Sequence, residues 1–241
     1  MSTMKNFFVF AIIATFVSLF TVTTSAQIVN GSFEEGNPVP SGFFAGYNAG
    51  DSGLTGWTVG GPGGIEVIDS GYWSATGNRS VDLSGGGIGS LSQTITTVPG
   101  LTYTVSFDMS GNPEGPYFNF FDDPVKSIVV TADGGQSATF SSDTIAEGNT
   151  STLTGSGSSD MMYSAKGYTF VASGTTTELA FTSQNANAFG PVLDNVSITN
   201  VTGQVCHRNN GASQRKTLIV GTAAIPAHLA HGDTAGACPA Q

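Results

Sequence analysis

The sequence predicts an all-β sandwich followed by a small appendage, and three observations carry this prediction. Stretches rich in Val, Thr, Tyr and Phe alternate apolar and polar residues with the period of two that strands require. The 33 glycines, with many serines, divide these stretches into short segments. Before the tail, no amphipathic run is long enough to predict a helix. About ten short strands with frequent turn signals are typical of a sandwich.

Residues 1–26 are expected to be a secretory signal peptide. Lys5 precedes an apolar run over residues 7–22, and Thr24, Ser25 and Ala26 supply the small residues of a cleavage site. The run is shorter than the ~20 residues of a membrane-spanning helix, so an uncleaved anchor is the less favoured alternative. No later segment is apolar enough to span a membrane as a helix. We therefore expect a secreted or cell-surface protein of about 215 residues after cleavage.

The main domain is expected over residues 27–203. The clearest alternation lies at residues 102–109, where four apolar residues from Tyr103 to Met109 share one face. Residues 89–98 similarly place Leu91, Gln93 and Ile95 together. The other predicted strands are short apolar segments bounded by Gly, Pro or Ser, at residues 27–33, 56–59, 65–68, 79–83, 125–132, 137–141, 161–172, 176–182 and 192–199.

The last of these strands contains a carboxylate at a position that the alternation marks as buried. Asp194 has the same parity as Val192, Val196 and Ile198. A buried carboxylate is costly unless it is paired, hydrogen-bonded or bound to a cation. We expect Asp194 to bind a structural Ca²⁺ together with Glu34 or Glu35, which would join the two ends of the domain. The alternative is that Asp194 accepts hydrogen bonds from backbone amides.

The distribution of charge excludes one class of partner. Between Gln27 and Gly203 there are sixteen acidic residues and three basic ones, whereas the tail has three basic residues and one acidic residue. An acidic domain has no basic stripe with which to neutralise phosphates, so nucleic acid is excluded as a partner. The same acidic balance is compatible with Ca²⁺, which takes oxygen ligands.

Aromatic and amide side chains in loops predict a carbohydrate-binding site. Sugar sites combine aromatic faces with a few placed polar groups, and an exposed aromatic patch marks an interaction site. The candidate ligand-binding residues are Tyr72, Trp73, Asn112, Tyr117, Phe118 and Phe120. The alternative for the aromatic loop is that it folds back over the sandwich. Trp57, next to a predicted strand, is expected in the core.

Catalysis has little support in the sequence. All three histidines lie in the tail, so the main domain has no imidazole for a Ser-His-Asp arrangement. A glycosidase needs two carboxylates at a set separation, but no spacing singles out a pair among Glu66, Asp69, Asp82 and Asp108. Asp82 is expected to face solvent or to accept a hydrogen bond at a loop. A non-catalytic protein is therefore expected.

The tail, residues 204–241, is expected to form a separate unit closed by a disulfide between Cys206 and Cys238. It contains a predicted strand at 217–220 and a short helix at 223–231, interrupted at Pro226. The potential metal ligands of the tail, as a site for a transition metal such as Zn²⁺, are His207, His228, His231 and Asp233. His228 and His231 are expected to share one helical face. The alternative is that these histidines only pack and form hydrogen bonds.

Several motifs, in the same order along the chain, resemble the choice-of-anchor C family of secreted bacterial proteins, which is related to plant cell-wall proteins of unknown function. They lie at residues 30–34 (NGSFE), 56–57 (GW), 77–83 (GNRSVDL), 98–103 (VPGLTY), 107–108 (FD), 111–113 (GNP) and 190–197 (GPVLDNVS). The resemblance implies a galactose-binding-like jelly roll with a structural Ca²⁺ between its first and last strands, and implies no activity. Two departures are the lack of a terminal anchoring segment and an aromatic insertion at 116–123. The tail resembles short modules appended to secreted bacterial proteins.

Together these observations predict a secreted, non-catalytic module that binds a polysaccharide of a cell envelope, matrix or wall. One alternative is a structural or adhesive matrix protein that docks onto other proteins. A weaker alternative is a glycan-active hydrolase.

Overall fold

The computed structural model describes residues 26–73, 75–114, 123–149, 160–208 and 215–239. Apart from Ala26, the predicted signal peptide lies outside these residues. The strands are accompanied by the 3₁₀ turns η1 (Asp133–Gly135) and η2 (Thr222–Ala224) and by the helix α2 (Ile225–Ala230). The strands are β1 (Phe44–Tyr47), β2 (Thr58–Gly60), β3 (Ile65–Asp69), β4 (Arg79–Asp82), β5 (Ser90–Thr96), β6 (Thr102–Gly111), β7 (Val125–Ala132), β8 (Gln136–Asp143), β9 (Ser164–Val171), β10 (Thr176–Ser183), β11 (Pro191–Asn200), β12 (Thr202–Arg208), β13 (Arg215–Gly221) and β14 (Thr234–Ala235).

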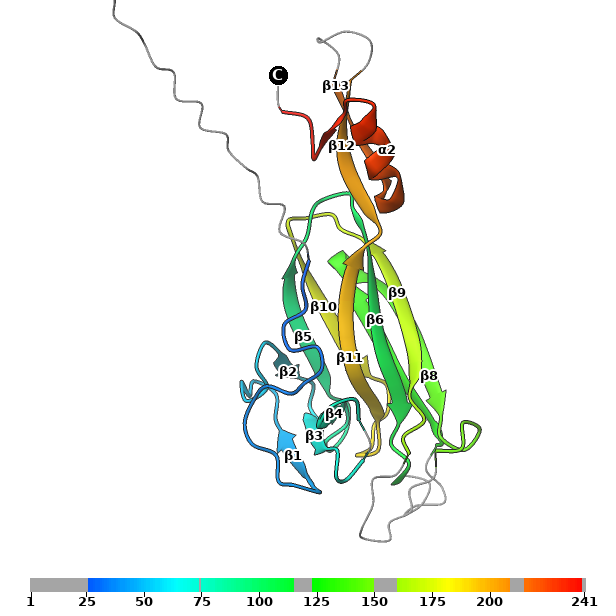
Figure 1. Cartoon of the computed structure of the whole chain (residues 1–241). Coiled ribbons are helices and arrows are strands. Elements are labelled where there is room, and N and C mark those ends of the chain that lie inside the picture. Colours follow the sequence, from blue (N-terminus) through cyan, green and yellow to red (C-terminus); the bar gives the residue numbers. More distant parts are fainter. Residues whose placement is uncertain (1–25, 74, 115–122, 150–159, 209–214, 240–241) are drawn as a thin grey trace, which may run out of the picture.

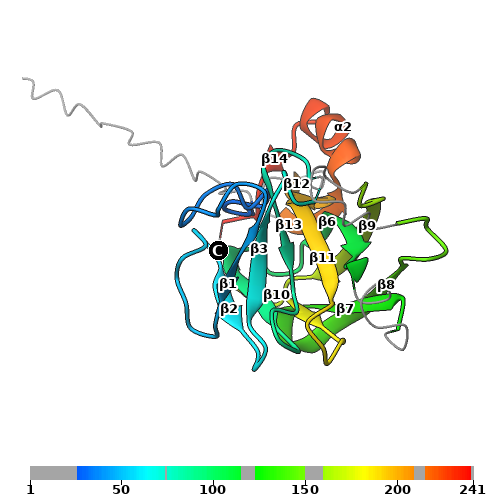
Figure 2. The ribbon, with the colours of Figure 1, turned by 90° about the horizontal axis from the view of Figure 1, so that it is seen from below.

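Two antiparallel sheets face each other and form a jelly-roll sandwich (Figures 1 and 2). One sheet has the strand order β1-β3-β4-β11-β6-β9, and the other has the order β2-β5-β10-β7-β8. Strands that are distant in sequence are neighbours in both sheets, so their pairing depends on long-range contacts. The predicted all-β sandwich is confirmed, and most predicted strands lie within a few residues of their predicted ends.

The main core lies between the two sheets and follows the predicted alternation. Along β6, Tyr103, Val105, Phe107 and Met109 are buried while the residues between them are more exposed. The ring of Phe107 packs edge-on against Phe181 of β10, with ring centroids 5.3 Å apart. Such aromatic pairs contribute about 0.5–1.5 kcal/mol beyond the burial of their area. Trp57 is also buried in this core, as predicted.

The predicted first strand, residues 27–33, is absent. Asn30 and Phe33 have positive φ angles of 53° and 60°, which break an extended conformation. Gln93 of β5 holds the segment through both backbone groups of Val29, while the Val196 amide donates to the Gly31 carbonyl at 2.8 Å. The two ends of the domain therefore meet as predicted, but through side-chain and single backbone bonds rather than a strand. The first strand is instead β1, in a stretch where no strand was predicted.

A β-bulge in β11 overturns the predicted single face of that strand. The register against β6 shifts between Asp194 and Ser197, and Asn195 has a φ of 51°. Leu193 and Val196 consequently both face the core between the sheets. Val192 instead joins a second apolar cluster with Ile68, Trp73 and Met161, so it and Asp194 do not share a face with Val196. Because successive side chains of a strand alternate between its two faces, the one extra residue of the bulge exchanges the faces of the residues that follow it.

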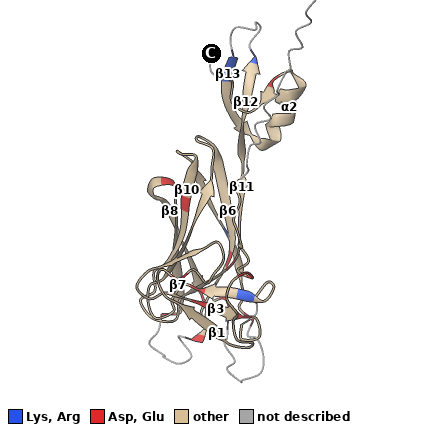
Figure 3. Cartoon of the chain, turned by 90° about the vertical axis from the view of Figure 1, so that its left-hand side faces the viewer, with Lys and Arg blue, Asp and Glu red and all other residues tan. Residues whose placement is uncertain are grey.

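The tail forms a third sheet, β13-β12-β14, with α2 beside it at one end of the sandwich (Figure 1). The predicted disulfide between Cys206 and Cys238 is confirmed. The predicted helix forms as η2 followed by α2, but Pro226 does not interrupt it, because this proline lies in the first turn of α2, where its missing amide is tolerated. Figure 3 shows basic residues on β13 and acidic residues across the sandwich. Among the described residues, no helix has the length and apolar character needed to cross a membrane.

Candidate functional site

A cavity of about 170 Å³ lies beside β1 and β3. These two strands lie toward the end of the sandwich opposite the third sheet (Figure 1). Residues from two strands of one sheet and from three loops converge on it. Its lining residues are Phe44, Glu66, Ile68, Tyr72, Trp73, Asn112, Glu114, Ala188 and Phe189. The cavity therefore combines aromatic rings with carboxyl and amide groups.

The aromatic wall is built by the turn that follows β3. The carbonyl of Asp69 accepts hydrogen bonds from the amides of Tyr72 and Trp73, and its carboxylate accepts from Gly42 and Gly71. The Tyr72 ring then lies edge-on to Phe44, with centroids 6.0 Å apart. Trp73 is only 2% exposed and packs in the second apolar cluster, whereas Tyr72 and Phe44 are half-buried. Tyr72 and Phe44 can therefore touch a ligand, as can Phe189, which is half-buried and lines the cavity from the loop after β10.

The polar wall depends on Asn112, which lies just after β6. Its side-chain amide donates to the Asp82 carboxylate at 2.7 Å, and its side-chain oxygen accepts from the Glu114 amide at 2.8 Å. Asp82 also accepts from the Ser84 and Gly190 amides. Asp82 is fully buried, so it does not face solvent, and the expected loop-side hydrogen bonds are present. This network fixes the direction in which Glu114 enters the cavity.

Two glutamates, Glu66 and Glu114, line this cavity. The Tyr72 hydroxyl donates a hydrogen bond to the Glu114 carboxylate. Burial, followed by the nearby charges of Asp82 and Glu114, raises the pKa of Glu66 to about 8. Burial also raises the pKa of Glu114, although the hydrogen bond from Tyr72 opposes this shift. Burial raises the pKa of Asp82 to about 7. At neutral pH Glu66 therefore keeps its proton.

The raised pKa of Glu66 predicts a pH-dependent stability. Between the ordinary pKa of 4.5 and about 8, the folded protein keeps a proton on Glu66 that the unfolded chain releases. The contribution of this proton to the free energy of unfolding is therefore full below pH 4.5 and is lost as the pH rises through about 8. Because Glu66 is partly exposed, we expect a loss of about 1–2 kcal/mol between pH 5 and pH 9. Urea unfolding at both pH values should show that Glu66→Gln removes this part of the loss. Parallel pH profiles for the two proteins would contradict the assignment.

The structure brings three of the six predicted ligand-binding residues, Tyr72, Trp73 and Asn112, to one cavity. Tyr117, Phe118 and Phe120 lie outside the described residues. Sequence reasoning missed Phe44, Glu114 and Phe189, and considered Glu66 only as an unpaired carboxylate. Glu66 did carry a signal, because it alternates with the core residues Ile65 and Val67 and therefore had to point out of the sandwich.

A second, wider groove lies beside the first described residues. Its volume is about 750 Å³, and it is lined by Ala26, Gln27, Val29, Gly56, Thr58, Gln93, Thr94, Ile95 and Thr96. It contains no aromatic and no ionisable side chain among these residues, and Gln93 is already engaged with Val29 and Gly56. It is therefore a weaker candidate than the cavity at β1 and β3.

The predicted calcium residues have other partners in the structure. Asp194 is fully buried and accepts hydrogen bonds from the amides of Thr76 and Asn195, at 2.9 and 2.7 Å. Glu34 accepts from the amides of Asn78 and Arg79, while Glu35 is exposed. Within the described residues, these three carboxylates do not form a group with ligand atoms within 4.8 Å of one another. A calcium ion bound by Glu34, Glu35 and Asp194 stays a prediction.

The tail holds a separate cluster of ionisable side chains. The Nδ1 atoms of His207 and His228 lie 2.9 and 2.8 Å from the same Asp233 oxygen. These hydrogen bonds, that from His207 above all, lower the pKa of Asp233. His231 is exposed and does not join the cluster, because α2 ends at Ala230 and His231 no longer follows the helical path.

Comparison with known proteins identifies a family but no curated relative. A family model described as "Protein of unknown function (DUF642)" matches residues 26–199. Among curated proteins, no sequence matches this chain. The resemblance to the choice-of-anchor C family and to tail modules of secreted proteins stays a prediction.

Solved structures that are similar to this chain include three carbohydrate-binding modules. TmCBM61 in complex with β-1,4-galactotriose has a TM-score of 0.43 and 14% identity, over 72% of this chain and 98% of its own. A family 35 carbohydrate-binding module from Clostridium thermocellum has a TM-score of 0.38 and 15% identity, over 64% and 96%. CBM35 from Paenibacillus barcinonensis has a TM-score of 0.36 and 16% identity, over 64% and 98%. These similarities are distant and do not identify a ligand for this chain.

Proposed function

Since this chain belongs to the DUF642 family, described as proteins of unknown function, we propose a function from its own cavity: it is a secreted, non-catalytic carbohydrate-binding module. The observation that carries the proposal is the meeting of half-buried aromatic rings with placed carboxyl and amide groups in one cavity. Aromatic faces bind the apolar faces of sugar rings, and polar groups bind hydroxyls. Its natural ligand is a polysaccharide of a cell envelope, matrix or wall.

The size of the cavity suggests how much of a glycan it takes. At about 170 Å³ it is smaller than the ~300–1,000 Å³ of pockets for drug-sized ligands. We infer that it holds one sugar unit, either a chain end or a side branch. No Lys or Arg is among its lining residues, so neutral or amine-bearing sugars suit it better than uronic acids.

Secretion is supported by the disulfide between Cys206 and Cys238, because such bonds persist in oxidising environments. The absence of a catalytic role is supported by the two cavity glutamates. Glycosidases push the pKa values of their two carboxyl groups apart. Here burial shifts the pKa values of Glu66 and Glu114 in the same direction, upward, and does not push them apart.

A glycan array tests the proposal. The full mature chain should be retained on neutral or amine-bearing glycans and should not be retained on polyuronates. Glu114→Gln should alter this retention, because Glu114 lines the cavity, whereas Glu178→Gln should leave it unchanged, because Glu178 is exposed on the opposite sheet. Absence of retention on every glycan would overturn the proposal.

A turnover assay on the retained polysaccharide separates binding from hydrolysis. We expect no new reducing ends after prolonged incubation. New reducing ends that disappear in both Glu66→Gln and Glu114→Gln would show instead that the chain is a glycan-active hydrolase.

A further inference from the structure

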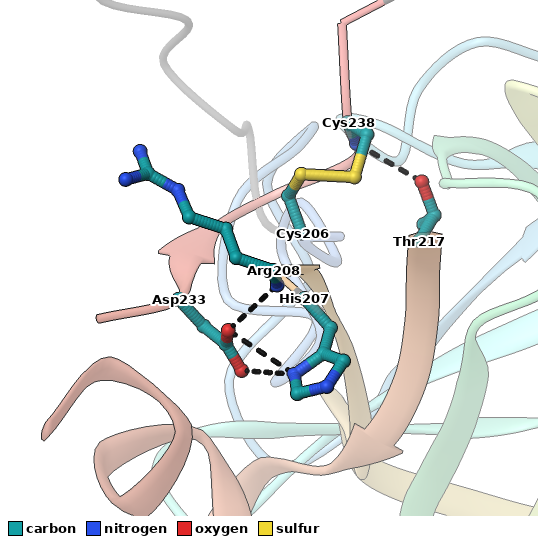
Figure 4. Close-up of a disulfide and its surroundings, with 6 residues drawn as sticks. All are labelled: Cys206, His207, Arg208, Thr217, Asp233 and Cys238. Carbon is teal, nitrogen blue, oxygen red and sulfur yellow. Dashed lines mark hydrogen bonds and ion pairs between the residues drawn. A yellow bond between two sulfur atoms is a disulfide. The ribbon is translucent and has the colours of Figure 1, made fainter. Parts of the chain in front are cut away.

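Two imidazoles and one carboxylate converge in the tail, remote from the proposed sugar cavity. One oxygen of Asp233 lies 2.9 Å from Nδ1 of His207 and 2.8 Å from Nδ1 of His228. The other Asp233 oxygen accepts a hydrogen bond from the Arg208 amide at 3.0 Å. Among the described residues, these three side chains form a group whose potential metal-ligand atoms all lie within 4.8 Å of one another. Figure 4 shows the His207 side of the cluster.

The three side chains come from different elements that are fixed to one another. His207 lies on β12 beside Cys206, whose disulfide to Cys238 ties the end of the chain to this strand. His228 lies on α2, and the Asp233 amide donates to the His228 carbonyl. β12 then pairs with β14, which begins directly after Asp233. The cluster is thus held in place by backbone and covalent bonds (Figure 4), and its geometry is prepared before any ligand arrives.

We propose that His207, His228 and Asp233 form a binding site for a divalent transition metal, with Zn²⁺ as the ion that the donor set fits best. Two imidazole nitrogens and one carboxylate oxygen are a ligand set that zinc accepts, and a water molecule completes four-coordinate geometry. Without metal, each Nδ1–H donates to the Asp233 carboxylate. On metal binding each imidazole would give up this proton from Nδ1 and carry its proton on Nε2, so that the Nδ1 lone pair binds the ion. The site is independent of the proposed sugar cavity.

The observed distances are close to those that zinc requires. Bond lengths of about 2.0–2.1 Å in tetrahedral geometry separate ligand atoms by roughly 3.3 Å. The two nitrogens now lie 2.9 and 2.8 Å from the shared oxygen, so each needs to withdraw by about half an ångström. Side-chain rotation supplies this, because the His207 and His228 side chains are 35% and 25% exposed. The same exposure gives the ion a path from solvent, while Asp233 is 3% exposed and anchors the base of the site.

Zinc binding to the full mature chain with its disulfide intact tests the proposal. After removal of metals with a chelator, titration calorimetry and elemental analysis should find one Zn²⁺ per chain, and the melting temperature should rise. His228→Ala and Asp233→Asn should each weaken binding at least tenfold. His231→Ala is the matched control, since His231 is only three residues from His228 but lies outside the cluster, and it should bind as the wild type does.

Co²⁺ supplies a readout that does not depend on the stability of any variant. In the wild-type chain, Co²⁺ should give the visible absorption of a four-coordinate site, and Zn²⁺ should displace it. Absence of stoichiometric zinc, equal binding by His228→Ala, or loss of binding in His231→Ala would overturn the proposal. Because the variants leave the sandwich intact, glycan retention should be the same for all of them, so failure of this site and failure of the sugar site are distinguishable.

Discussion

Tyr72→Ala is expected to lower the affinity for the preferred glycan at least tenfold, which corresponds to ~1.4 kcal/mol. Tyr72 supplies a half-buried ring at the cavity and also donates a hydrogen bond to Glu114, so the substitution removes an aromatic face and leaves a carboxyl group unpaired. Buried aromatic anchors carry a large share of binding energy at interfaces. Titration calorimetry with the glycan selected on the array measures the effect.

One further variant separates the ring from its hydroxyl group, and a second serves as a control. Tyr72→Phe keeps the ring and should lose less affinity than Tyr72→Ala, while Ile145→Ala, in an exposed position away from the cavity, should lose none. Trp73→Ala is unsuitable as a binding test, because Trp73 is buried with Ile68 and Val192 and its truncation should destabilise the fold by about 3–5 kcal/mol. Unchanged affinity in Tyr72→Ala would remove the ring from the binding site.

Gly31→Ala is expected to lower the melting temperature by about 6–12 °C, equivalent to ~3 kcal/mol in a domain of this size. A β-carbon at position 31 would overlap the carbonyl oxygen of Val196, which belongs to the bulged strand β11. The same contact includes the hydrogen bond from the Val196 amide to the Gly31 carbonyl. To accept the methyl group, the N-terminal segment has to move away from β11 and lose this bond. Thermal unfolding followed by circular dichroism measures the shift.

The matched control is Gly46→Ala on the edge strand β1. A β-carbon at Gly46 meets no atom within 4 Å, so this substitution should change the melting temperature little. If both alanine variants melt like the wild type, then the contact between the two ends of the domain does not contribute to stability. That result would also weaken the predicted role of a calcium ion at this junction.

Much of the fold could be predicted from local patterns, because a strand with one buried face alternates apolar and polar residues along the sequence. The alternation along β6 and β5 predicted their buried residues correctly, and Trp57 was placed in the core. The pattern failed at β11, because a single residue in the left-handed region, Asn195, shifts the register and exchanges the two faces. It also failed at residues 27–33, where the Asn30 side chain bonds to the Glu35 and Thr55 carbonyls instead of leaving the chain free to extend.

The candidate sites, like the fold, could be predicted from the sequence only in part. From the sequence alone, Tyr72, Trp73 and Asn112 could be selected as loop residues, since aromatic and amide side chains in Gly-rich segments are visible without a structure. Their assembly with Phe44, Glu66 and Glu114 could not be predicted, because these residues come from β1, β3 and the segment after β6, and only the order of strands within one sheet brings them to the same cavity. The environment that raises the pKa of Glu66 likewise exists only after packing buries its carboxyl group and brings Asp82 and Glu114 close to it.

In the tail, sequence by itself determined the disulfide, since two cysteines in one short segment have one intramolecular pairing available. It also identified His207, His228 and Asp233 as possible ligands. Only the tertiary structure decided that His231 stays outside: α2 ends one residue before it, and the return of the chain to β14 places Asp233 between the other two imidazoles. Composition and periodicity determine which residues are buried in strands, whereas pairings between distant segments determine which polar groups meet.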